Sequence, residues 1–233
     1  MSHPFVLFGR DHLSALALTL VVPLLLAFMT QRNTAAVRAV RVLFATWLIG
    51  AWIVWFWMIF RLGWQSPQTL LPMHLCDWAT IVTIITLMRP NQRTYELSYF
   101  WCLCGTLQAM LTPDLAYGFP DMRFDIFFAF HAGVIAAMLY LTFGAKMRPI
   151  LASIPRVMAW SLVYAAAAGV VDWVFGVNFG YLRAKPAEVS LMNALAPWPW
   201  YIAELVMLGI VSILIWYLPW LILDRTRAER RQA

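Results

Sequence analysis

The sequence is poor in charged residues. Asp, Glu, Lys and Arg make up 12% of its 233 residues, whereas soluble domains average about 25%. Hydrophobic residues make up 63%, and the mean hydropathy is +0.72. A soluble fold would have to bury apolar runs of about 20 residues in a core larger than a chain of this size can build. The scarcity of charge therefore excludes an ordinary soluble protein and predicts a polytopic membrane protein.

Cysteine is also scarce. Three cysteines, Cys76, Cys102 and Cys104, cannot form a disulfide framework, and two residues that are two positions apart on a helix point to different faces. The sequence contains neither a CxxC nor an HxxxH spacing. Metal-ligand residue types are present, but their spacing does not predict a metal site. We expect neither a metal nor a cofactor.

The excess of basic residues does not indicate a nucleic-acid-binding protein. The formal net charge is +6, but Lys and Arg lie in short clusters between apolar runs and form no single basic stripe. This distribution is typical of residues that set the orientation of membrane helices. We expect no nucleic-acid partner.

Seven apolar segments are long enough to cross a bilayer, which requires about 20 residues. No domain boundary or repeat separates them, so we expect one all-α membrane domain over residues 1–233. The predicted helices lie at about 13–29, 42–60, 72–88, 96–112, 124–143, 157–176 and 200–223.

Basic residues alternate between the two sides of these segments. Most of the 17 lie in segments that the positive-inside rule assigns to the cytoplasm, including Arg32, Arg38, Arg41, Arg89, Arg93, Lys146, Arg148, Arg156 and those after residue 224. The N-terminus is therefore predicted outside and the C-terminus in the cytoplasm. Most acidic residues then fall on the outer side, which predicts that the polar chemistry is there.

Polar residues cluster at the start of the third apolar segment. The run Leu71–Thr80, LPMHLCDWAT, contains Pro72, His74, Cys76 and Asp77. Ionisable groups are costly inside a bilayer, so such a cluster indicates a functional site. Pro72 suits the first helical position, which would place Cys76 about 6 Å below the helix end. His74 and Asp77, three residues apart, share a face that Cys76 does not, and we assign them supporting or structural roles.

Cys76 and His131 are our candidate catalytic pair. A thiol with an ordinary pKa near 8.5 is mostly protonated at neutral pH, and a histidine can accept its proton. The predicted fifth helix brings His131 to a similar depth under the outer surface. His131 continues an aromatic stripe whose members lie at i, i+3, i+4 and i+7: Phe124, Phe127, Phe128 and His131. A packing stripe and a buried structural histidine are the alternative interpretations.

Further polar residues could support this pair. A carboxylate could orient the histidine through its second nitrogen, although each such group could equally be an interhelical hydrogen-bond partner. His74 or Gln108 could stabilise an oxyanion. The supporting candidates are His74, Asp77, Gln108, Asp114, Asp172, Asn193 and Glu204.

Three basic residues in the predicted outer loops are candidates for binding a lipid headgroup. Arg123 lies among carboxylates in the segment Leu111–Asp125, and Arg183 and Lys185 precede the PWPW run. Arginine and lysine beside a membrane site suit a phosphate group. Solvated loop charges are the alternative explanation.

Several sequence blocks resemble a known family. The runs LPMHLCDWA, YELSYFWCLCGTLQAMLTPDL, YGFPDMRFD, FFAFHAG, LTF and LMNALAPWPWY, between about residues 70 and 220, are similar to the YwaF-type integral membrane proteins of bacteria. That family is related to the eukaryotic transmembrane protein that acts as an acyltransferase in ether-phospholipid remodelling. The resemblance implies a seven-helix fold, a catalytic cysteine at Cys76 and a catalytic histidine at His131. It also implies a bacterial cytoplasmic (inner) membrane location.

Two classes of function remain open. The first is a membrane-embedded lipid acyltransferase or hydrolase that acts near the outer leaflet on a phospholipid or lysophospholipid through an acyl-thioester. The second is a transporter or small-molecule binding protein that uses the same polar funnel. Against transport, the ionisable residues cluster near one face and do not continue through the midplane. A scaffold or assembly role would not require the catalytic pair.

Overall fold

The computed structural model describes residues 3–186 and 191–232, and their regular structure is helical. The elements are α1 (Arg10–Thr30), α2 (Thr34–Leu62), α3 (Pro67–Leu70), α4 (Leu75–Met88), α5 (Gln92–Trp101), the π-helix η1 (Cys102–Thr106), α6 (Leu107–Leu111), α7 (Met122–Phe143), α8 (Ser153–Phe175), the 3₁₀ turns η2 (Phe179–Tyr181) and η3 (Leu191–Ala194), and α9 (Trp200–Gln232). An isolated bridge joins Pro4 to Tyr117.

Six segments of the described chain are long and apolar enough to cross a membrane: α1, α2, α3 with α4, α7, α8 and α9. The other expected helix, at 96–112, begins earlier, at Gln92, and runs through α5, η1 and α6 to Leu111. The expected all-α membrane fold is therefore confirmed, with six to seven candidate spans.

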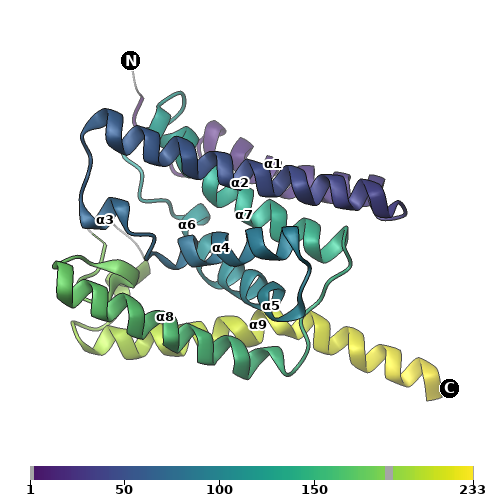
Figure 1. The fold of residues 1–233 in the computed structure, drawn as a ribbon. Helices are drawn as coiled ribbons and strands as arrows, with labels where there is room; N and C mark the ends of the chain where they lie inside the picture. Colours follow the sequence, from purple (N-terminus) through teal and green to yellow (C-terminus); the bar gives the residue numbers. More distant parts are fainter. Residues whose placement is uncertain (1–2, 187–190, 233) are drawn as a thin grey trace.

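The helices form three layers. Helices α1 and α2 lie on one side, α8 and α9 lie on the other, and α4, α5 and α7 lie between them (Figure 1). The outer helices expose large apolar side chains, with Phe28 77% and Trp173 84% exposed. Such surfaces are unusual in soluble monomers and suit contact with lipid.

Helix α7 is the most enclosed of the six long spans. Within its most apolar window 61% of residues are buried, against at most 33% in the other five. A close approach to α2 depends on Gly133, because a Cβ there would lie 2.9 Å from the Trp47 indole nitrogen. The same indole donates a hydrogen bond to the Ala129 carbonyl at 2.9 Å. Small residues at such contacts are typical of membrane helix packing.

The start of α4 differs from the sequence prediction. The helix begins at Leu75, with His74 as its N-cap, and Pro72 lies in the preceding extended segment. It is Pro67 that occupies the first helical position, in the one-turn helix α3 capped by Ser66. Proline lacks a backbone N–H and restricts the preceding residue, so two prolines five residues apart separate α3 from α4.

This late start makes α4 a short helix. Its 14 residues span about 21 Å, less than the roughly 30 Å hydrocarbon core of a bilayer. Figure 1 shows that α4 begins partway along the bundle, while α3 lies nearer its end. The residues Leu71–His74, which are not helical, connect α3 to α4. Cys76 therefore lies in the first turn of a helix that begins inside the bundle.

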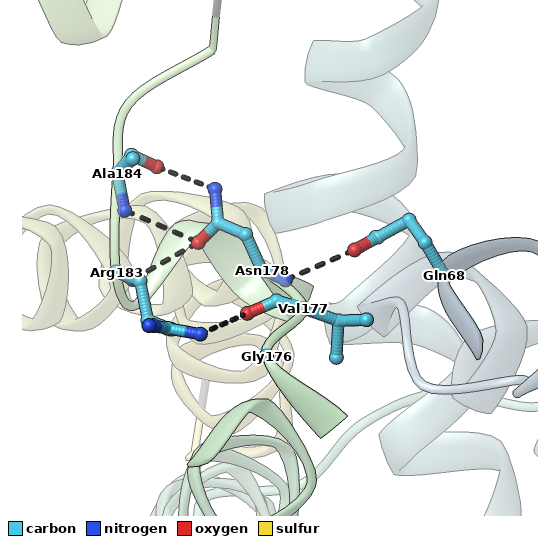
Figure 2. Close-up of a pocket in the computed structure, with 6 residues that line it drawn as sticks. All are labelled: Gln68, Gly176, Val177, Asn178, Arg183 and Ala184. Carbon is cyan, nitrogen blue, oxygen red and sulfur yellow. Dashed lines mark hydrogen bonds between the residues drawn. The ribbon is translucent and has the colours of Figure 1, made fainter. Parts of the chain in front are cut away.

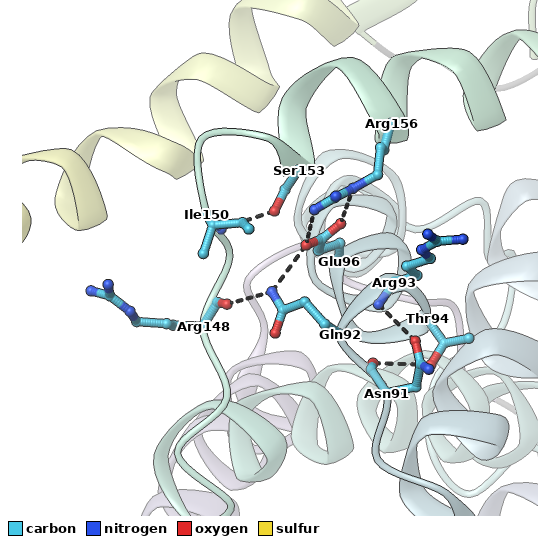
Figure 3. Close-up of polar contacts among 9 residues, drawn as sticks. All are labelled: Asn91, Gln92, Arg93, Thr94, Glu96, Arg148, Ile150, Ser153 and Arg156. Carbon is cyan, nitrogen blue, oxygen red and sulfur yellow. Dashed lines mark hydrogen bonds and ion pairs between the residues drawn. The ribbon is translucent and has the colours of Figure 1, made fainter.

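The opposite end of the bundle is held by an ion pair whose carboxylate is buried. Glu96 of α5 is 1% exposed and accepts two hydrogen bonds from the Arg156 guanidinium of α8, at 2.9 and 2.6 Å. The Gln92 amide donates to the same carboxylate and to the Arg148 carbonyl (Figure 3). A carboxylate with these partners is stabilised in spite of its burial.

Replacing Arg156 tests the contribution of the Glu96–Arg156 ion pair to stability. We expect Arg156→Ala to lower the free energy of unfolding by about 3 kcal/mol, because it leaves the buried Glu96 charge uncompensated. Thermal unfolding in detergent measures the change. Arg93 is an exposed arginine beside this ion pair (Figure 3). Arg93→Ala is the matched control and should unfold like the wild type. Adding Glu96→Gln to Arg156→Ala should recover stability; an unchanged double variant would contradict this account.

Candidate functional site

The HLCD motif forms the first turn of α4. The backbone N–H of His74 donates to the Asp77 carboxylate at 2.9 Å, so Asp77 reaches back to the N-cap as in one half of a capping box. A negative charge in this position also favours the helix dipole. The arrangement fixes where α4 begins and hence where Cys76, the second helical residue, is held.

A polar chain connects the His74 ring to the loop after α8. The Gln68 side-chain oxygen accepts from the Asn178 backbone N–H at 2.9 Å, which leaves the Gln68 NH₂ group to donate to His74 Nε2 at 3.2 Å. In this bond His74 Nε2 is the acceptor. The ring also packs edge-on against Phe179, with centroids 4.9 Å apart. His74 is held by these contacts on the side of α3 and η2.

The π-helix η1 packs against the first turn of α4. A Cβ on Gly105 would lie 2.9 Å from Leu75 Cδ2, so only glycine allows this approach without a shift of Leu75. The next residue, Thr106, is completely buried, and its hydroxyl lies close to the Cys76 thiol. Single turns of π-helix inside α-helices are frequent at functional sites. Here the π-turn brings a hydroxyl to the candidate nucleophile.

His131 has a defined tautomer in α7. Its Nδ1 lies 2.9 Å from the Phe127 carbonyl oxygen one turn earlier. A carbonyl oxygen only accepts, so Nδ1 carries the proton and Nε2 of the neutral ring keeps its lone pair. The ring stacks on Phe127 with centroids 4.1 Å apart. Nε2 is thus the nitrogen that can accept a proton, and a main-chain carbonyl orients the ring.

Cys76 and His131 belong to neighbouring helices, because α4 packs against α7. Both side chains are partly exposed, and His131 is in electrostatic contact with His74 at the N-cap of α4. In the described part of the chain, no hydrogen bond joins the thiol to the imidazole. In the aromatic stripe, Phe124 and Phe128 are buried in a cluster with Met110. Phe127 packs against that cluster and also stacks on the histidine.

The other supporting candidates are dispersed. Asp172 is buried in α8, where Oδ1 accepts from the Phe179 backbone N–H at 2.7 Å. Glu204 of α9 accepts from the Ala196 N–H at 2.8 Å. Asp172 therefore holds the loop after α8, and Glu204 holds the loop before α9. Gln108 in α6, Asp114 after it and Asn193 in η3 have exposed side chains.

The three basic candidates differ in how they are held. Arg123 makes two contacts of 2.8 Å with the Asp121 carboxylate and lies 3.6 Å over the Tyr117 ring. These bonds lower the pKa of Asp121 to about 2, so its charge persists at neutral pH and occupies the guanidinium. Lys185 donates to the Leu195 carbonyl at 2.6 Å.

Arg183 lines a hollow of about 490 Å³ beyond the end of α8. Its other lining residues include Gln68, Val177 and Asn178 (Figure 2). Arg183 Nη1 donates to the carbonyls of Asp172 and Val177, at 3.1 and 3.4 Å. These are neutral acceptors, and among the described residues no carboxylate forms an ion pair with Arg183. Gln68 connects this hollow to His74.

Four residues were not predicted from the sequence: Thr106, Gln68, Tyr164 and His12. Thr106 lies close to Cys76, and Gln68 donates to His74. Tyr164 of α8 lies close to the first turn of α4. A lone tyrosine within the small apolar run of α8 was the available signal. His12, also missed, is structural, because it accepts from the Phe8 N–H at 3.0 Å and donates to the Met110 carbonyl at 2.8 Å.

Replacing Gly105 tests the packing that holds Cys76. We expect Gly105→Val to move the first turn of α4 and to slow alkylation of Cys76 by N-ethylmaleimide, because the new side chain overlaps Leu75. Mass spectrometry of Cys76 measures the rate. Leu75→Ala in the same chain should restore much of it. Gly50→Val, at a glycine with open space around it, is the control. If Gly50→Val and Gly105→Val slowed the alkylation of Cys76 equally, the packing of Gly105 against Leu75 would not be what holds Cys76.

Comparison with known proteins identifies the family. No curated protein and no solved structure matches the chain. The model of the TMEM164 family matches residues 7–217, which include the HLCD motif, η1 and His131. With this match over most of its length and its apolar helices, the chain belongs to the TMEM164 family of transmembrane proteins.

Proposed function

We propose that this protein is a membrane-embedded lipid acyltransferase or lipid hydrolase in which Cys76 is the nucleophile and His131 the base. The observation that carries the proposal is the position of Cys76 in the first turn of a helix that begins inside the bundle. The first N–H groups of a helix have no intrahelical acceptor and favour negative charge. The helix N-terminus therefore favours a thiolate in this place, against the cost of burying its charge, and a base is needed to take the proton.

The chemistry follows a Cys–His mechanism. His131 Nε2 accepts the thiol proton as Cys76 Sγ attacks the carbonyl carbon of a lipid ester. The resulting tetrahedral species expels the lysolipid oxygen, which takes the proton back from His131, and leaves an acyl-thioester. A second hydroxyl, from an acceptor lipid or from water, then attacks the thioester and regenerates the thiol. The acceptor decides between transfer and hydrolysis.

The geometry of His131 supports this assignment. Because Nδ1 donates to the Phe127 carbonyl, the free lone pair is on Nε2 throughout the resting state. The Nδ1 bond also stabilises the imidazolium that forms during attack, as the aspartate does in a serine-protease triad. We propose that lipid entry between α4 and α7 brings Sγ and Nε2 together, since catalytic hydrogen bonds tighten when substrate binds.

We also propose the orientation and location of the site. The distribution of Lys and Arg supports an outer N-terminus and a cytoplasmic C-terminus. The start of α4 then faces the outer leaflet, and the end that carries Glu96 and Arg156 faces the cytoplasm. The resemblance to YwaF-type proteins supports a bacterial inner membrane, and their eukaryotic relative supports a phospholipid or lysophospholipid substrate.

Acyl transfer to the thiol provides the direct test. We incubate the purified protein with phosphatidylglycerol that carries an alkyne-tagged acyl chain and detect label that hydroxylamine removes, as it removes thioesters. The wild type should become labelled on Cys76. Cys76→Ser and His131→Ala should lose this label, because one removes the thiol and the other the base, a loss of about 100-fold or more.

Cys104→Ser is the matched control. Cys104 is also partly buried, two residues before Thr106, but it is not in the first turn of α4. This variant should be labelled like the wild type. Hydroxylamine-sensitive labelling that persists in both Cys76→Ser and His131→Ala would refute the mechanism. Thermal unfolding of each variant establishes that lost labelling does not reflect lost structure.

We further propose that Arg183 and the adjoining hollow bind the phosphate of the lipid headgroup. A guanidinium that donates to neutral carbonyls, and to no carboxylate, has donors left for an anion. Gln68 connects the hollow to the N-cap of α4, so a headgroup there would lie on the Cys76 side of the bundle. Arg123 is the weaker candidate, because Asp121 occupies it.

Substrates with and without phosphate test this assignment. We expect Arg183→Ala to raise KM for phosphatidylglycerol about tenfold or more, the equivalent of one charge-assisted hydrogen bond. Its activity on p-nitrophenyl palmitate, which has no phosphate, should stay at the wild-type level. Arg183→Lys should be intermediate. Arg61→Ala, an exposed arginine at the end of α2, is the control; equal losses on both esters would contradict headgroup binding.

A further inference from the structure

Three side-chain atoms in the described part of the chain are buried without a hydrogen-bond partner: Thr106 Oγ1, Tyr164 Oη and Asp172 Oδ2. A buried polar atom without a partner costs about 1–3 kcal/mol, and native proteins contain few of them. Thr106 and Asp172 are at most 1% exposed and Tyr164 is 7% exposed. Their lack of partners therefore needs a physical explanation.

Two of the three atoms lie around Cys76. The Thr106 hydroxyl, from η1, lies close to the Cys76 thiol, and no hydrogen bond joins the two groups. The Tyr164 hydroxyl, from α8, is in electrostatic contact with Cys76 and approaches the backbone of Leu75. A Cβ on Gly180, in the loop after α8, would lie 3.0 Å from the Tyr164 hydroxyl, so glycine leaves this hydroxyl its space. Two helices thus direct unpaired hydroxyls at the first turn of α4.

The third atom has a different chemistry. A carboxylate oxygen only accepts hydrogen bonds, whereas hydroxyl groups also donate. In its ionised form Asp172 therefore does not stabilise a developing negative charge, and its Oδ1 already accepts from the Phe179 N–H. Thr106 and Tyr164 each have a hydrogen to donate. The backbone N–H of Cys76, in the first turn of α4, supplies a third donor without an intrahelical acceptor.

We propose that the hydroxyls of Thr106 and Tyr164, with the backbone N–H of Cys76, form the oxyanion-binding site of this protein. The inference rests on the proposed acyl-transfer function and adds two residues to it. When Sγ forms its bond to the ester carbon, the carbonyl π electrons move to oxygen. That oxyanion accepts the waiting hydrogen bonds, and its electrons reform the C=O bond as the lysolipid oxygen leaves. Donors that are unpaired beforehand need no reorganisation.

This arrangement explains why the donors are unpaired at rest. A hydroxyl that already had a strong acceptor would have to exchange it during the reaction, which would reduce the stabilisation that it provides. The sequence candidates for this role differ in position: Gln108 is exposed, and His74 Nε2 accepts from Gln68. The site uses the hydroxyls of Thr106 in η1 and Tyr164 in α8, two residues that lie 58 positions apart in the chain.

The test uses Thr106→Val and Tyr164→Phe, which remove the hydroxyls and keep the side-chain shapes. With p-nitrophenyl palmitate in detergent micelles, the rate of the p-nitrophenolate burst reports formation of the acyl-enzyme. We expect each variant to lower this rate about 100-fold, as loss of one oxyanion donor does. Alkylation of Cys76 by N-ethylmaleimide, which forms no oxyanion from an ester, should keep its wild-type rate.

Two hydroxyls that are already paired supply the controls. Thr80→Val removes a buried hydroxyl that donates to the Cys76 carbonyl, and Tyr99→Phe removes one that donates to the Trp216 carbonyl. Neither should slow the burst comparably. Thr106→Val and Tyr164→Phe should unfold at or above the wild-type temperature, because removing an unpaired buried hydroxyl is neutral or stabilising. A fall in their unfolding temperature would show that the hydroxyls have partners and would overturn the proposal.

The outcomes separate this inference from the proposed function. If the wild type gives no acyl-enzyme on Cys76, the proposed function fails and the oxyanion site fails with it. If the wild type is acylated and both variants react at its rate, the Cys–His mechanism stands and the oxyanion assignment is overturned. If acylation and alkylation fall together, the hydroxyls position Cys76, which also overturns the assignment.

Discussion

The need to pair backbone N–H and C=O groups inside a bilayer dominates this structure. Hydrocarbon offers these groups no hydrogen bonds, so irregular backbone at membrane depth must be enclosed by protein or line a cavity. Leu71–His74 is non-helical backbone within the candidate span Pro67–Met88, because α4 is too short to span a membrane alone. Asp77, Gln68 and Phe179 surround its last residue, His74. The same packing around Leu71–His74 also places Cys76 close to the hydroxyls of Thr106 and Tyr164.

The two ends of the bundle satisfy their polar groups differently. At one end, Glu96 has three hydrogen bonds and a guanidinium partner, and this arrangement joins α5 to α8. At the other end, the hydroxyls of Thr106 and Tyr164 have no partner, although burial makes that costly. Fully paired polar groups are typical of structural contacts, whereas unpaired ones are typical of sites where another molecule supplies the partner. This contrast supports placing the chemistry at the start of α4.

Hydropathy predicted the membrane class and the approximate helices because apolar runs of about 20 residues have few other uses. The boundaries were less predictable. The expected start at Pro72 was wrong, since Asp77 reaches back to the N-cap His74 and the helix begins three residues later, at Leu75. The expected helix at 96–112 contains a π-turn at Cys102–Thr106, and no pattern in CLCGT distinguishes a π-turn from an ordinary helical turn. Local hydrogen-bond competition decides both features.

The sequence by itself determined that this is an all-α membrane protein. It also singled out the HLCD motif and His131 as the candidate site, because ionisable groups in an apolar chain are conspicuous. Only the tertiary structure decided which groups meet Cys76. Thr106 and Tyr164 are ordinary residues for a membrane helix, and their significance comes from packing: Gly105 admits one to α4 and Gly180 leaves space for the other. Their lack of partners is a property of the folded interior, where burial removes water, and no residue pattern records it.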